Sequence, residues 1–334
     1  MLTPHLDRTT ARAVIALANR APSVHNSQPW RWRIGPSSIH LFADPERAMP
    51  ATDPEGRDLR VSCGAALHHL RVALLAAGLA TTVNRLPDPG QPLHLAALEM
   101  HSGRPSPEDL ALARAIENRR SDRRVFSSWP VPPEMLSVLT RAVAREGALL
   151  TVIDDHSQRA GVARLVEHAA VEQALTPELA QETAEWTGRS QGAREGVPAA
   201  NVPAEPEGTV PVRHFAGGEQ AQSVLGQHES DGTVLALLST PGDTPLDQLR
   251  AGEALSAVLL AATHFGMATD PISQPLEVPA TRAELQASIL GGTSAPQVLL
   301  RLGWAPMSTI PVPQTGRRPL ADTIDHLDSA DGDV

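Results

Sequence analysis

Hydrophobic and polar positions alternate in the first hundred residues in a way that predicts both helices and strands. Apolar side chains recur with helical spacing from residue 9 to residue 21, and Pro22 ends that run. Thr9 or Thr10 is expected to cap this first helix. Period-two alternation predicts a hairpin shortly after it. The expected elements are helices over 9–21 and 59–77 and strands over 30–34, 39–42 and 93–98.

The rest of the chain predicts further elements and one segment in which the pattern fades. We expect helices over 132–146, 157–175 and 249–265, strands over 148–153, 233–238 and 297–302, and a helix that carries residues 119–124. Over 176–232, Pro, Gly, Glu and Gln dominate. Because that length exceeds an ordinary loop, it predicts a functional lid or a mobile segment. Residues 325–334 are predicted to form a frayed acidic tail.

A repeat relates the two parts of the chain. Residues 64–81 align without gaps to residues 252–269 at an offset of 188, and seven of the eighteen positions are identical. The helix over 9–21 corresponds to the helix over 132–146 at an offset of about 123, so the second copy holds roughly 60 extra residues. We therefore predict an α+β fold of two related halves, 1–108 and 109–324, with 176–232 as an insertion in the second and 325–334 as the tail.

Composition narrows the class of protein. The 334 residues include 28 basic ones, all Arg, against 38 Asp and Glu, for a net charge of −10, which argues against nucleic-acid binding. There is one cysteine and no Lys or Tyr. These counts exclude disulfide frameworks, multi-cysteine metal sites, lysine Schiff bases and tyrosine proton donors. No signal peptide and no apolar stretch long enough for a bilayer is found, so we expect a cytoplasmic protein with no membrane contact.

The loop over 22–30 is the sharpest local feature. It places Ser23 and Asn26 beside an apolar wall, between a helix end and a strand. Backbone N–H and amide groups in such a loop suit the polar edge of a planar heteroaromatic ring. On residue chemistry alone, the more common explanation is a turn whose Ser and Asn satisfy their own backbone.

A run of arginines over 119–123 is the second feature. Guanidinium groups offer paired donors to phosphate oxygens, and Ser121 adds a hydroxyl. Taken alone, such a run is more often a solvated helix face. A further basic cluster over 316–319 either completes an anion site or is an ordinary loop.

Together these motifs resemble those of the nitroreductase family of flavin mononucleotide (FMN) enzymes. That family carries Ala-Pro-Ser-x-x-Asn-x-Gln-Pro-Trp near the flavin ring, Arg-Arg-Ser-x-Arg at the phosphate, a Gly-terminated apolar helix and a C-terminal Arg-x-Pro-Leu. The matching segments here are 21–30, 119–123, 252–266 and 317–320. The resemblance covers most of the chain outside 176–232.

One departure from the family implies a particular arrangement. In ordinary members the arginine motif precedes the Ala-Pro-Ser motif in one domain, and two subunits share each flavin. Here the Ala-Pro-Ser motif lies in the first half and the arginine motif in the second. The resemblance therefore implies a nitroreductase-like dimer fused into one chain with one flavin site between the halves, as in the Acg-like branch, whose long lid the 176–232 segment would match. It implies a monomer with internal pseudo-dimer symmetry.

The resemblance also transfers a set of site residues. Arg119, Ser121, Arg123 and Arg317, helped by Arg120 and Arg318, would hold the phosphate, while the Ala-Pro-Ser loop and the segment after the repeat helix would line the flavin ring. The ring-lining residues are Pro22, Ser23, Val24, His25, Asn26, Ser27, Gln28, Pro271, Ile272, Ser273 and Gln274.

Since the flavin carries the hydride chemistry, no catalytic triad is expected. His25 is a weak candidate for a proton donor, and a structural hydrogen bond is its commoner role. No metal site is expected, because adjacent His68 and His69 point to different helix faces.

Two functions follow from this reading. One is an FMN-dependent oxidoreductase that passes two electrons from a donor such as NAD(P)H to a nitroaromatic or quinone-like acceptor. The alternative is a protein that stores or sequesters FMN under the lid, with little NAD(P)H-dependent turnover. Neither the donor nor the acceptor can be read from the residues.

Overall fold

The computed structural model describes residues 6–35, 37–204, 213, 215, 217–220, 231–306 and 310–326. The helices are α1 (Arg8–Ala18), α2 (Arg57–Ala76), α3 (Pro107–Asn118), α4 (Pro133–Arg145), α5 (His156–Leu175), α6 (Pro177–Trp186), α7 (Pro245–His264), α8 (Gln274–Glu277) and α9 (Pro279–Leu290). The strands are β1 (Trp30–Ile34), β2 (Ser38–Ala43), β3 (Leu79–Arg85), β4 (His94–Ser102), β5 (Leu149–Ile153), β6 (Val234–Thr240), β7 (Ala268–Ile272), β8 (Ala295–Gly303) and β9 (Ile324–His326). Among the described helices, none has the length and apolar character needed to span a membrane.

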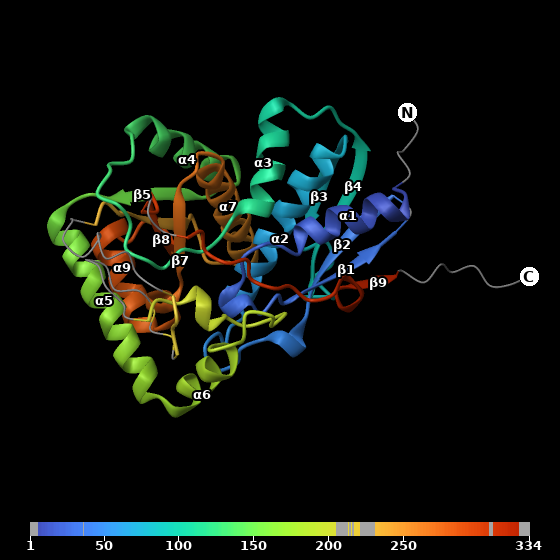
Figure 1. Cartoon of the computed structure of the whole chain (residues 1–334). Coiled ribbons are helices and arrows are strands. Elements are labelled where there is room, and N and C mark those ends of the chain that lie inside the picture. The colour runs from blue at the N-terminus through green and yellow to red at the C-terminus, as the bar shows by residue number, and fades with distance from the viewer. Residues whose placement is uncertain are drawn as a thin grey trace, which may run out of the picture.

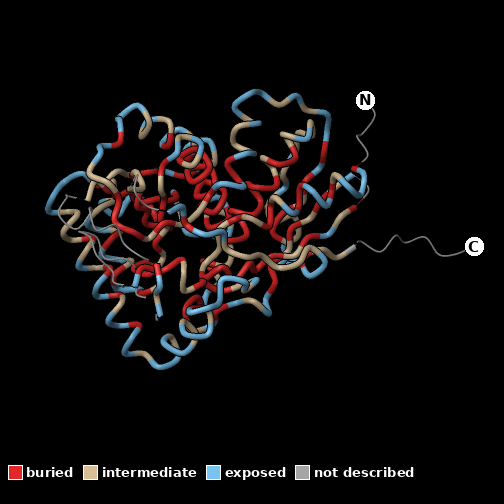
Figure 2. The backbone as a smooth tube through the Cα atoms, viewed as in Figure 1, coloured by how far each residue is buried: buried red, intermediate tan, exposed pale blue. Residues whose placement is uncertain are grey.

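Two lobes lie side by side, each with a sheet (Figure 1). One sheet has the strand order β3-β4-β2-β1-β9, and the other has the order β5-β6-β8-β7. Helices α2 and α7 lie between the lobes (Figure 1). Buried backbone is concentrated inside each lobe and along these two helices (Figure 2). The result is the α+β fold that the sequence predicts.

The first lobe follows closely from its sequence pattern. Strand β1 starts and ends where the alternation predicts, and its inward-facing Trp30 and Trp32 are fully buried. Both indole N–H groups donate to Asn19 Oδ1 at 2.9 Å, so the end of α1 and the sheet share one polar anchor. The cap of α1 is Asp7 rather than a threonine, because its carboxylate accepts from the first N–H groups of the helix.

The predicted helix over 119–124 is wrong. Helix α3 ends at Asn118, and Arg119 already has an extended ψ of 127°. From there the backbone runs beside strand β7, where Ser121 bridges Thr269 and the Asp122 N–H donates to the Thr269 carbonyl at 2.9 Å. A strand edge thus supplies the hydrogen bonds that a helix would have made, and tertiary contact decides the conformation.

Other elements lack a clear signal in the sequence. Strand β3 is mostly half-exposed, and β7 contains Pro271, which argues against a strand unless that residue sits at an edge. Strand β9 begins one residue before the predicted acidic tail, runs into it and pairs parallel to β1, so the tail prediction is wrong for residues 325 and 326. Residues 327–334 of the predicted tail lie outside the described part of the chain.

Equivalent residues of the sequence repeat meet where α2 crosses α7. Arg60 Nη1 donates to Gln248 Oε1 at 2.7 Å, and His68 Nδ1 lies 2.7 Å from Ser256 Oγ; both pairs are 188 residues apart. Gly64 faces Gly252 at the same offset, with so little space that a Cβ on Gly64 would lie 2.0 Å from the Leu249 carbonyl oxygen. Self-contact of equivalent positions is the geometry of a twofold axis. The strand orders β3-β4-β2-β1 and β7-β8-β6-β5 correspond in the same way.

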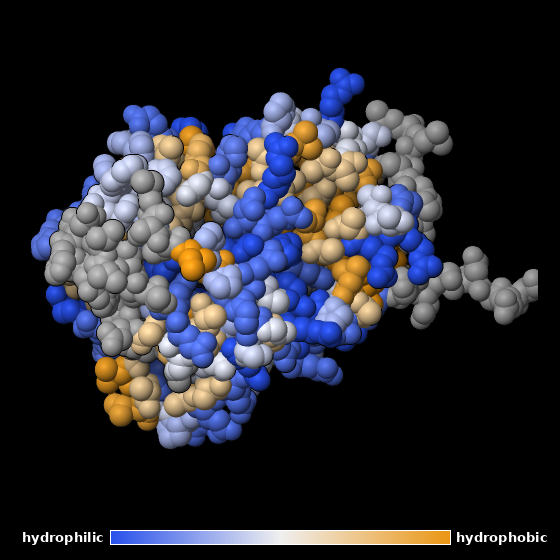
Figure 3. Space-filling view, in the orientation of Figure 1, coloured by the Kyte–Doolittle hydropathy of each residue, from blue (hydrophilic) through white to orange (hydrophobic). Residues whose placement is uncertain are grey.

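The C-terminal segment crosses from the second lobe to the first (Figure 1). After residue 310 it runs along the lobe boundary, and the Trp32 N–H donates to the Thr323 carbonyl at 2.7 Å just before β9 joins β1. Arg31 and Asp325 close this junction with an ion pair of 2.6 Å. A band of hydrophilic residues occupies the middle of this face between the lobes (Figure 3).

Only part of the predicted lid is described. It contains helix α6, a short turn at Ala199–Asn201 and bridges that pair Arg189 with Pro198 and Pro203 with Gln220. Arg213 and Phe215 are also placed. The remaining residues of 205–230 lie outside the description, apart from 217–220.

Candidate functional site

The loop after α1 adopts a backbone that few side chains accept. His25, Asn26 and Gln28 have φ values of 50°, 56° and 52°, in the left-handed region. Such strain persists where surrounding contacts fix it, and it gathers at functional sites. Here the Gln28 N–H donates to Ser23 Oγ at 2.9 Å, and the Val24 N–H donates to Ser62 Oγ of α2 at 3.2 Å.

Hydrogen bonds from distant segments also fix the conformation of this loop. Asn26 Nδ2 donates to the carbonyls of Gly196 and Gly316, both at 3.2 Å, and Gln28 Nε2 donates to the Arg194 carbonyl at 2.9 Å. The predicted lid and the C-terminal segment therefore both rest on the loop. The side-chain amides of Asn26 and Gln28 therefore form hydrogen bonds with other segments of the chain.

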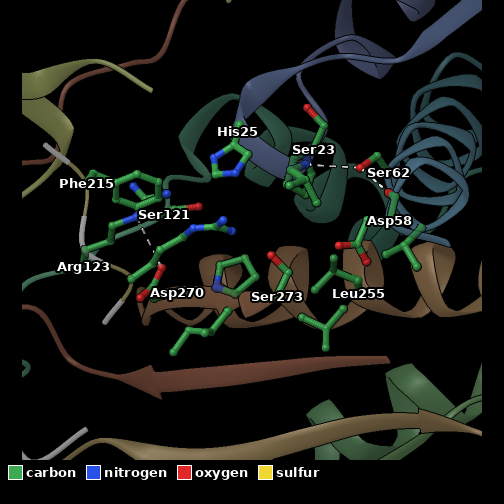
Figure 4. A pocket seen from close by; sticks show the side chains of 17 residues that line it. Ser23, His25, Asp58, Ser62, Ser121, Arg123, Phe215, Leu255, Asp270 and Ser273 are labelled. Atoms are coloured by element: carbon green, nitrogen blue, oxygen red, sulfur yellow. Dashed lines mark hydrogen bonds and ion pairs between the residues drawn. The ribbon is translucent and has the colours of Figure 1, made fainter. Parts of the chain in front are cut away.

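A cavity begins at this loop and extends between α2, α7 and β7 (Figure 4). Apolar walls come from Leu255, Ile272 and Val298, and Ser62 and Ser273 lie among them. Asp58 lies at one end, and Phe215 and Arg123 lie at the other (Figure 4). The cavity is mostly apolar with several polar groups in its lining, which suits a ring system.

A second cavity adjoins the first and is strongly basic. The two share Pro22, Ser23, His25, Ser121 and Arg123. The added residues include four arginines, none of which forms an ion pair within the described residues: Arg20, Arg119, Arg120 and Arg317.

Arg119 shows the electrostatic cost of this cluster. Its side chain is buried, and its Nε and Nη1 have no hydrogen-bond partner among the placed residues. Burial, followed by the nearby charges of Arg120, Arg20 and Arg123, lowers its pKa to about 10. Burial and the neighbouring Arg119 likewise lower the pKa of Arg317 to about 9. An uncompensated buried cation is unfavourable unless an anion joins it.

The four arginines differ in how many donors they leave free. Arg317 directs its N–H groups to backbone carbonyls, including those of Asn19 at 2.9 Å and Arg20 at 3.0 Å, so it fixes the end of α1 and contributes charge. Arg120 uses Nη1 on the carbonyls of Glu117 and Arg119. Arg119 is therefore the best placed to donate to an anion.

Two residues of the predicted lid, Arg213 and Phe215, line the first cavity. Arg213 Nη1 pairs with Glu277 of α8 at 2.7 Å, and both side chains are almost fully buried. Glu277 also accepts from Ser273 Oγ at 2.7 Å. Phe215 lies edge-on to His25, with ring centres 5.8 Å apart, and the Arg123 guanidinium lies 5.0 Å from its ring centre. The first cavity measures about 90 Å³, and the adjoining basic cavity measures about 70 Å³.

His25 is held neutral in this position. Burial, reinforced by the charge of Arg213, lowers its pKa to about 3 despite the opposing effect of Glu277. Neither ring nitrogen has a hydrogen-bond partner among the described residues. The structural hydrogen bond expected as its commoner role is therefore not formed here.

The structure brings most of the predicted site residues together. Those that line the two cavities are Pro22, Ser23, Val24, His25, Asn26, Arg119, Arg120, Ser121, Arg123, Pro271, Ile272, Ser273 and Arg317. Four others line neither cavity and make contacts elsewhere. Gln28 and Arg318 contact each other, Ser27 accepts from Arg47, and Gln274 donates to Gln173.

Several lining residues escaped the sequence analysis. Arg20 closes the basic cavity, and Asp58, Ser62 and Asp270 line the ring cavity. Position on α2 gives a signal for Asp58 and Ser62, since they lie six and two residues before the repeat begins at Gly64. Arg20 immediately precedes the Ala-Pro-Ser motif, whereas nothing local marks Asp270.

The described residues contain no group of three or more His, Cys, Asp or Glu side chains arranged to hold a metal ion. Cys63 is buried, its thiol lies 3.1 Å from the Pro29 carbonyl oxygen, and burial raises its pKa. A reactive thiolate is therefore not present at this position.

Comparison with known proteins places the chain among relatives of similar length. It is 42% identical over 326 residues to "Putative NAD(P)H nitroreductase Rv3131" of Mycobacterium tuberculosis, covering 97% of this chain and 94% of that protein. It is 35% identical over 332 residues to "Putative NAD(P)H nitroreductase acg" of the same organism, covering 96% of each. No family model matches the chain.

Among solved structures, the chain is similar to a nitroreductase with bound FMN from Desulfitobacterium hafniense. The identity is 14%, the TM-score is 0.39, and the match covers 65% of this chain and 98% of that one.

Proposed function

This chain is a member of the nitroreductase family, and from that premise we propose that it binds one FMN between its two lobes and acts as an FMN-dependent oxidoreductase. The observation that carries the proposal is the cluster of arginines without carboxylate partners among the described residues. In this cluster Arg119 is buried with two unpartnered donor nitrogens, and the cluster adjoins a mostly apolar cavity. A phosphate joined to a planar ring matches both ends.

At the basic end, Arg119 would donate to the phosphate, with Ser121 and Arg120 beside it. Arg20 and Arg317 would add charge from the end of α1 and the C-terminal segment. Bidentate guanidinium donors and a dianionic phosphate form strong charge-assisted hydrogen bonds. The favourable interaction would offset the cost of burying the cations.

At the ring end, the chain's own residues would position the flavin and exclude water. The loop over 22–26 would border one side of the ring, and residues 270–273 would border the other. Leu255 and Val298 supply an apolar floor. Bound FMN supplies two-electron hydride transfer, and a quinone-like or nitroaromatic acceptor suits a ring-shaped slot of this kind.

We infer a single site because ion-paired charged residues occupy the equivalent position in the other lobe. At the repeat offset of 123, Glu146 is equivalent to Ser23. At the offset of 188, Arg85 is equivalent to Ser273 and Glu253 to Ala65. These three residues form ion pairs there: Arg85 Nε lies 2.7 Å from Glu253, and Arg71 Nη1 lies 2.6 Å from Glu146 and 2.8 Å from Glu253. Fully buried Glu253 would exclude a second flavin. The self-contacts of α2 and α7 support a fused dimer, built from residues 1–108 and 109–324.

The test is a visible absorption spectrum of the purified protein, followed by anaerobic addition of NADPH. Flavin bands that bleach promptly support an oxidoreductase with an open route to the ring. Absence of flavin bands after incubation with FMN would contradict the proposal. Arg119→Ala should bind less FMN, and Arg114→Ala, which removes an exposed arginine of α3, is the control for nonspecific loss of charge.

The second function, storage of FMN, is favoured by the covering contacts of Phe215 and Arg213. Cofactor pockets usually measure about 300–1,000 Å³, so these residues have to move before a flavin enters. Glu277→Gln removes the charge that holds Arg213. Under the storage function this variant exchanges FMN faster and becomes reducible by NADPH, whereas unchanged exchange would show that the segment does not limit access.

A further inference from the structure

A separate acidic cavity adjoins the ring end of the proposed flavin site. It has a volume of about 380 Å³ and lies between α2, α8, α9 and the start of β8. Five carboxyl groups line it against two guanidinium groups, Arg57 and Arg282. Arg282 is already paired with Asp243 at 2.8 Å. The lining therefore has a net negative charge, which disfavours an anionic ligand.

Asp58 is the residue that both cavities share at their junction. It lies in the first turn of α2, and its carboxyl group points into the ring cavity (Figure 4). Only 3% of the residue is exposed. One oxygen lies 2.5 Å from Arg57 Nη2, while Oδ2 has no partner among the described residues. A buried carboxyl oxygen without a partner is costly unless it serves a ligand.

We propose that Asp58 is a catalytic acid that delivers a proton to an uncharged acceptor, of the quinone class, bound where the acidic cavity meets the flavin ring. This inference rests on the proposed FMN site. It adds a proton source beside the flavin, and it assigns the acidic cavity as the route for the acceptor and for water.

The charges around Asp58 keep its proton available near neutrality. Burial raises the pKa of Asp58 to about 7, helped by Asp53 from the preceding loop and Glu277 from α8, and opposed by Arg57 and Arg213. His25, in the loop opposite, is neutral at this pH. A general acid is most effective when its pKa is close to the working pH.

The proposed step balances atoms and electrons. Reduction of a quinone to a hydroquinone takes two electrons and two protons. A hydride from reduced FMN brings both electrons and one proton. The O–H bond of Asp58 breaks to give the second proton to the quinone oxygen, leaving a carboxylate beside Arg57. Water in the acidic cavity then returns a proton to Asp58.

The experiment reduces FMN-loaded protein with dithionite and follows its reoxidation by 1,4-benzoquinone or by ferricyanide. Ferricyanide takes electrons without protons, so it isolates proton delivery. We expect Asp58→Asn to slow the benzoquinone reaction by about 100-fold and to remove a rate decrease as the pH rises through about 7. The ferricyanide reaction should be unchanged, and Asp58→Glu should recover part of the benzoquinone rate.

The matched control is Glu55→Gln, which removes an exposed carboxylate from the same cavity without touching the ring site. Equal slowing with both acceptors, or an unchanged benzoquinone rate and pH profile, would overturn the proposal.

An infrared titration gives a readout that does not depend on turnover. The wild-type protein should show a carboxylic-acid C=O band that disappears as the pH rises through about 7 and is missing in Asp58→Asn. If the wild type shows no such band, Asp58 is not the acid, whatever the variants do. If instead the wild type binds no FMN, the proposed function itself fails, and the reoxidation assay cannot give a positive result.

Discussion

At the scale of single residues, the proposed site holds side chains in states that folding by itself disfavours. Arg119 is a buried cation with unpartnered donors, and His25 is a buried imidazole with a left-handed backbone. Each destabilises the protein without ligand. Such costs are commonly retained where binding or catalysis requires them. Two substitutions test these costs: one measures both stability and FMN binding at Arg119, and the other measures acid stability at His25.

Arg119→Met should weaken FMN binding and stabilise the FMN-free protein. Loss of charge-assisted hydrogen bonds costs about 1.5–3 kcal/mol, or about 10- to 150-fold in the dissociation constant. Removal of a buried cation whose pKa is lowered to about 10 should raise the free energy of unfolding by about 1–3 kcal/mol. Fluorescence titration with FMN and urea unfolding measure the two effects. A variant that loses both affinity and stability would contradict this assignment.

His25→Asn should make the protein less sensitive to acid. The folded state lowers the pKa of His25 from 6.5 to about 3, so the unfolded chain binds the proton more tightly. Stability from neutral His25 is therefore present above pH 6.5 and is lost as the pH falls toward 3. At pH 5 the loss is about 2 kcal/mol. Asn suits a positive φ, which keeps the loop intact.

Urea unfolding at pH 7 and pH 5 measures this effect. The decrease in unfolding free energy between the two should be smaller by about 2 kcal/mol in His25→Asn than in the wild type. Some acid sensitivity should persist, because burial also lowers the pKa of His68 to about 4. Exposed His264→Asn is the control, and an equal change in that variant would show that burial of His25 is not the cause.

At the scale of elements, the crossing of α2 and α7 determines how the lobes meet. Gly64 and Gly252 allow the two backbones to approach within a distance that no side chain permits. The sequence repeat marks both glycines, whereas their contact is visible only in the fold. Most helices and strands with strong periodicity were predicted correctly, including α2 and α7 beside the site, but strand β7 and the extended run over 119–123 were not. The arginine run over 119–123 is extended because it pairs with β7, which lies about 150 residues further along the chain.

Gly64→Ala should destabilise the protein strongly. Its Cβ would lie 2.0 Å from the Leu249 carbonyl oxygen, which is backbone and cannot move aside alone. The steric cost, at least about 3 kcal/mol, exceeds the gain of about 1 kcal/mol from better helix propensity. Thermal unfolding of the FMN-free protein measures the difference.

The matched control is Gly161→Ala in α5, where a Cβ would meet only the end of the Arg164 side chain at 3.8 Å. That change should be neutral or stabilising by up to about 1 kcal/mol. Similar destabilisation of both variants would contradict the close crossing as the cause.

At the scale of the whole molecule, the proposed site draws residues from two lobes and from the C-terminal segment that crosses between them. Loop 22–26 comes from the first lobe, residues 119–123 and 270–273 from the second, and Arg317 from the segment that ends in β9. Under the proposed function, a single chain would provide what two subunits would otherwise supply. The internal axis occupies the surface through which a dimer would form, so the chain has little need of a second copy.

We therefore expect a 35.4 kDa monomer that binds one FMN. Sedimentation equilibrium of the FMN-loaded protein, with flavin and protein absorbance read together, gives mass and stoichiometry in one experiment. Two FMN molecules per chain would show that the ion pairs of Glu253 do not fill the second position. A mass of twice the chain would place a further interface outside the α2–α7 crossing.

The sequence by itself determined the local elements, the internal repeat and the residues that line most of the site. Periodicity and fixed motif spacing are properties of short segments, so they survive without a structure. Only the tertiary structure decided which charges lack partners, which backbone is extended beside β7, and that Asp58 lies between two cavities. These depend on segments far apart in the chain, because burial and pairing are set by what folding brings together.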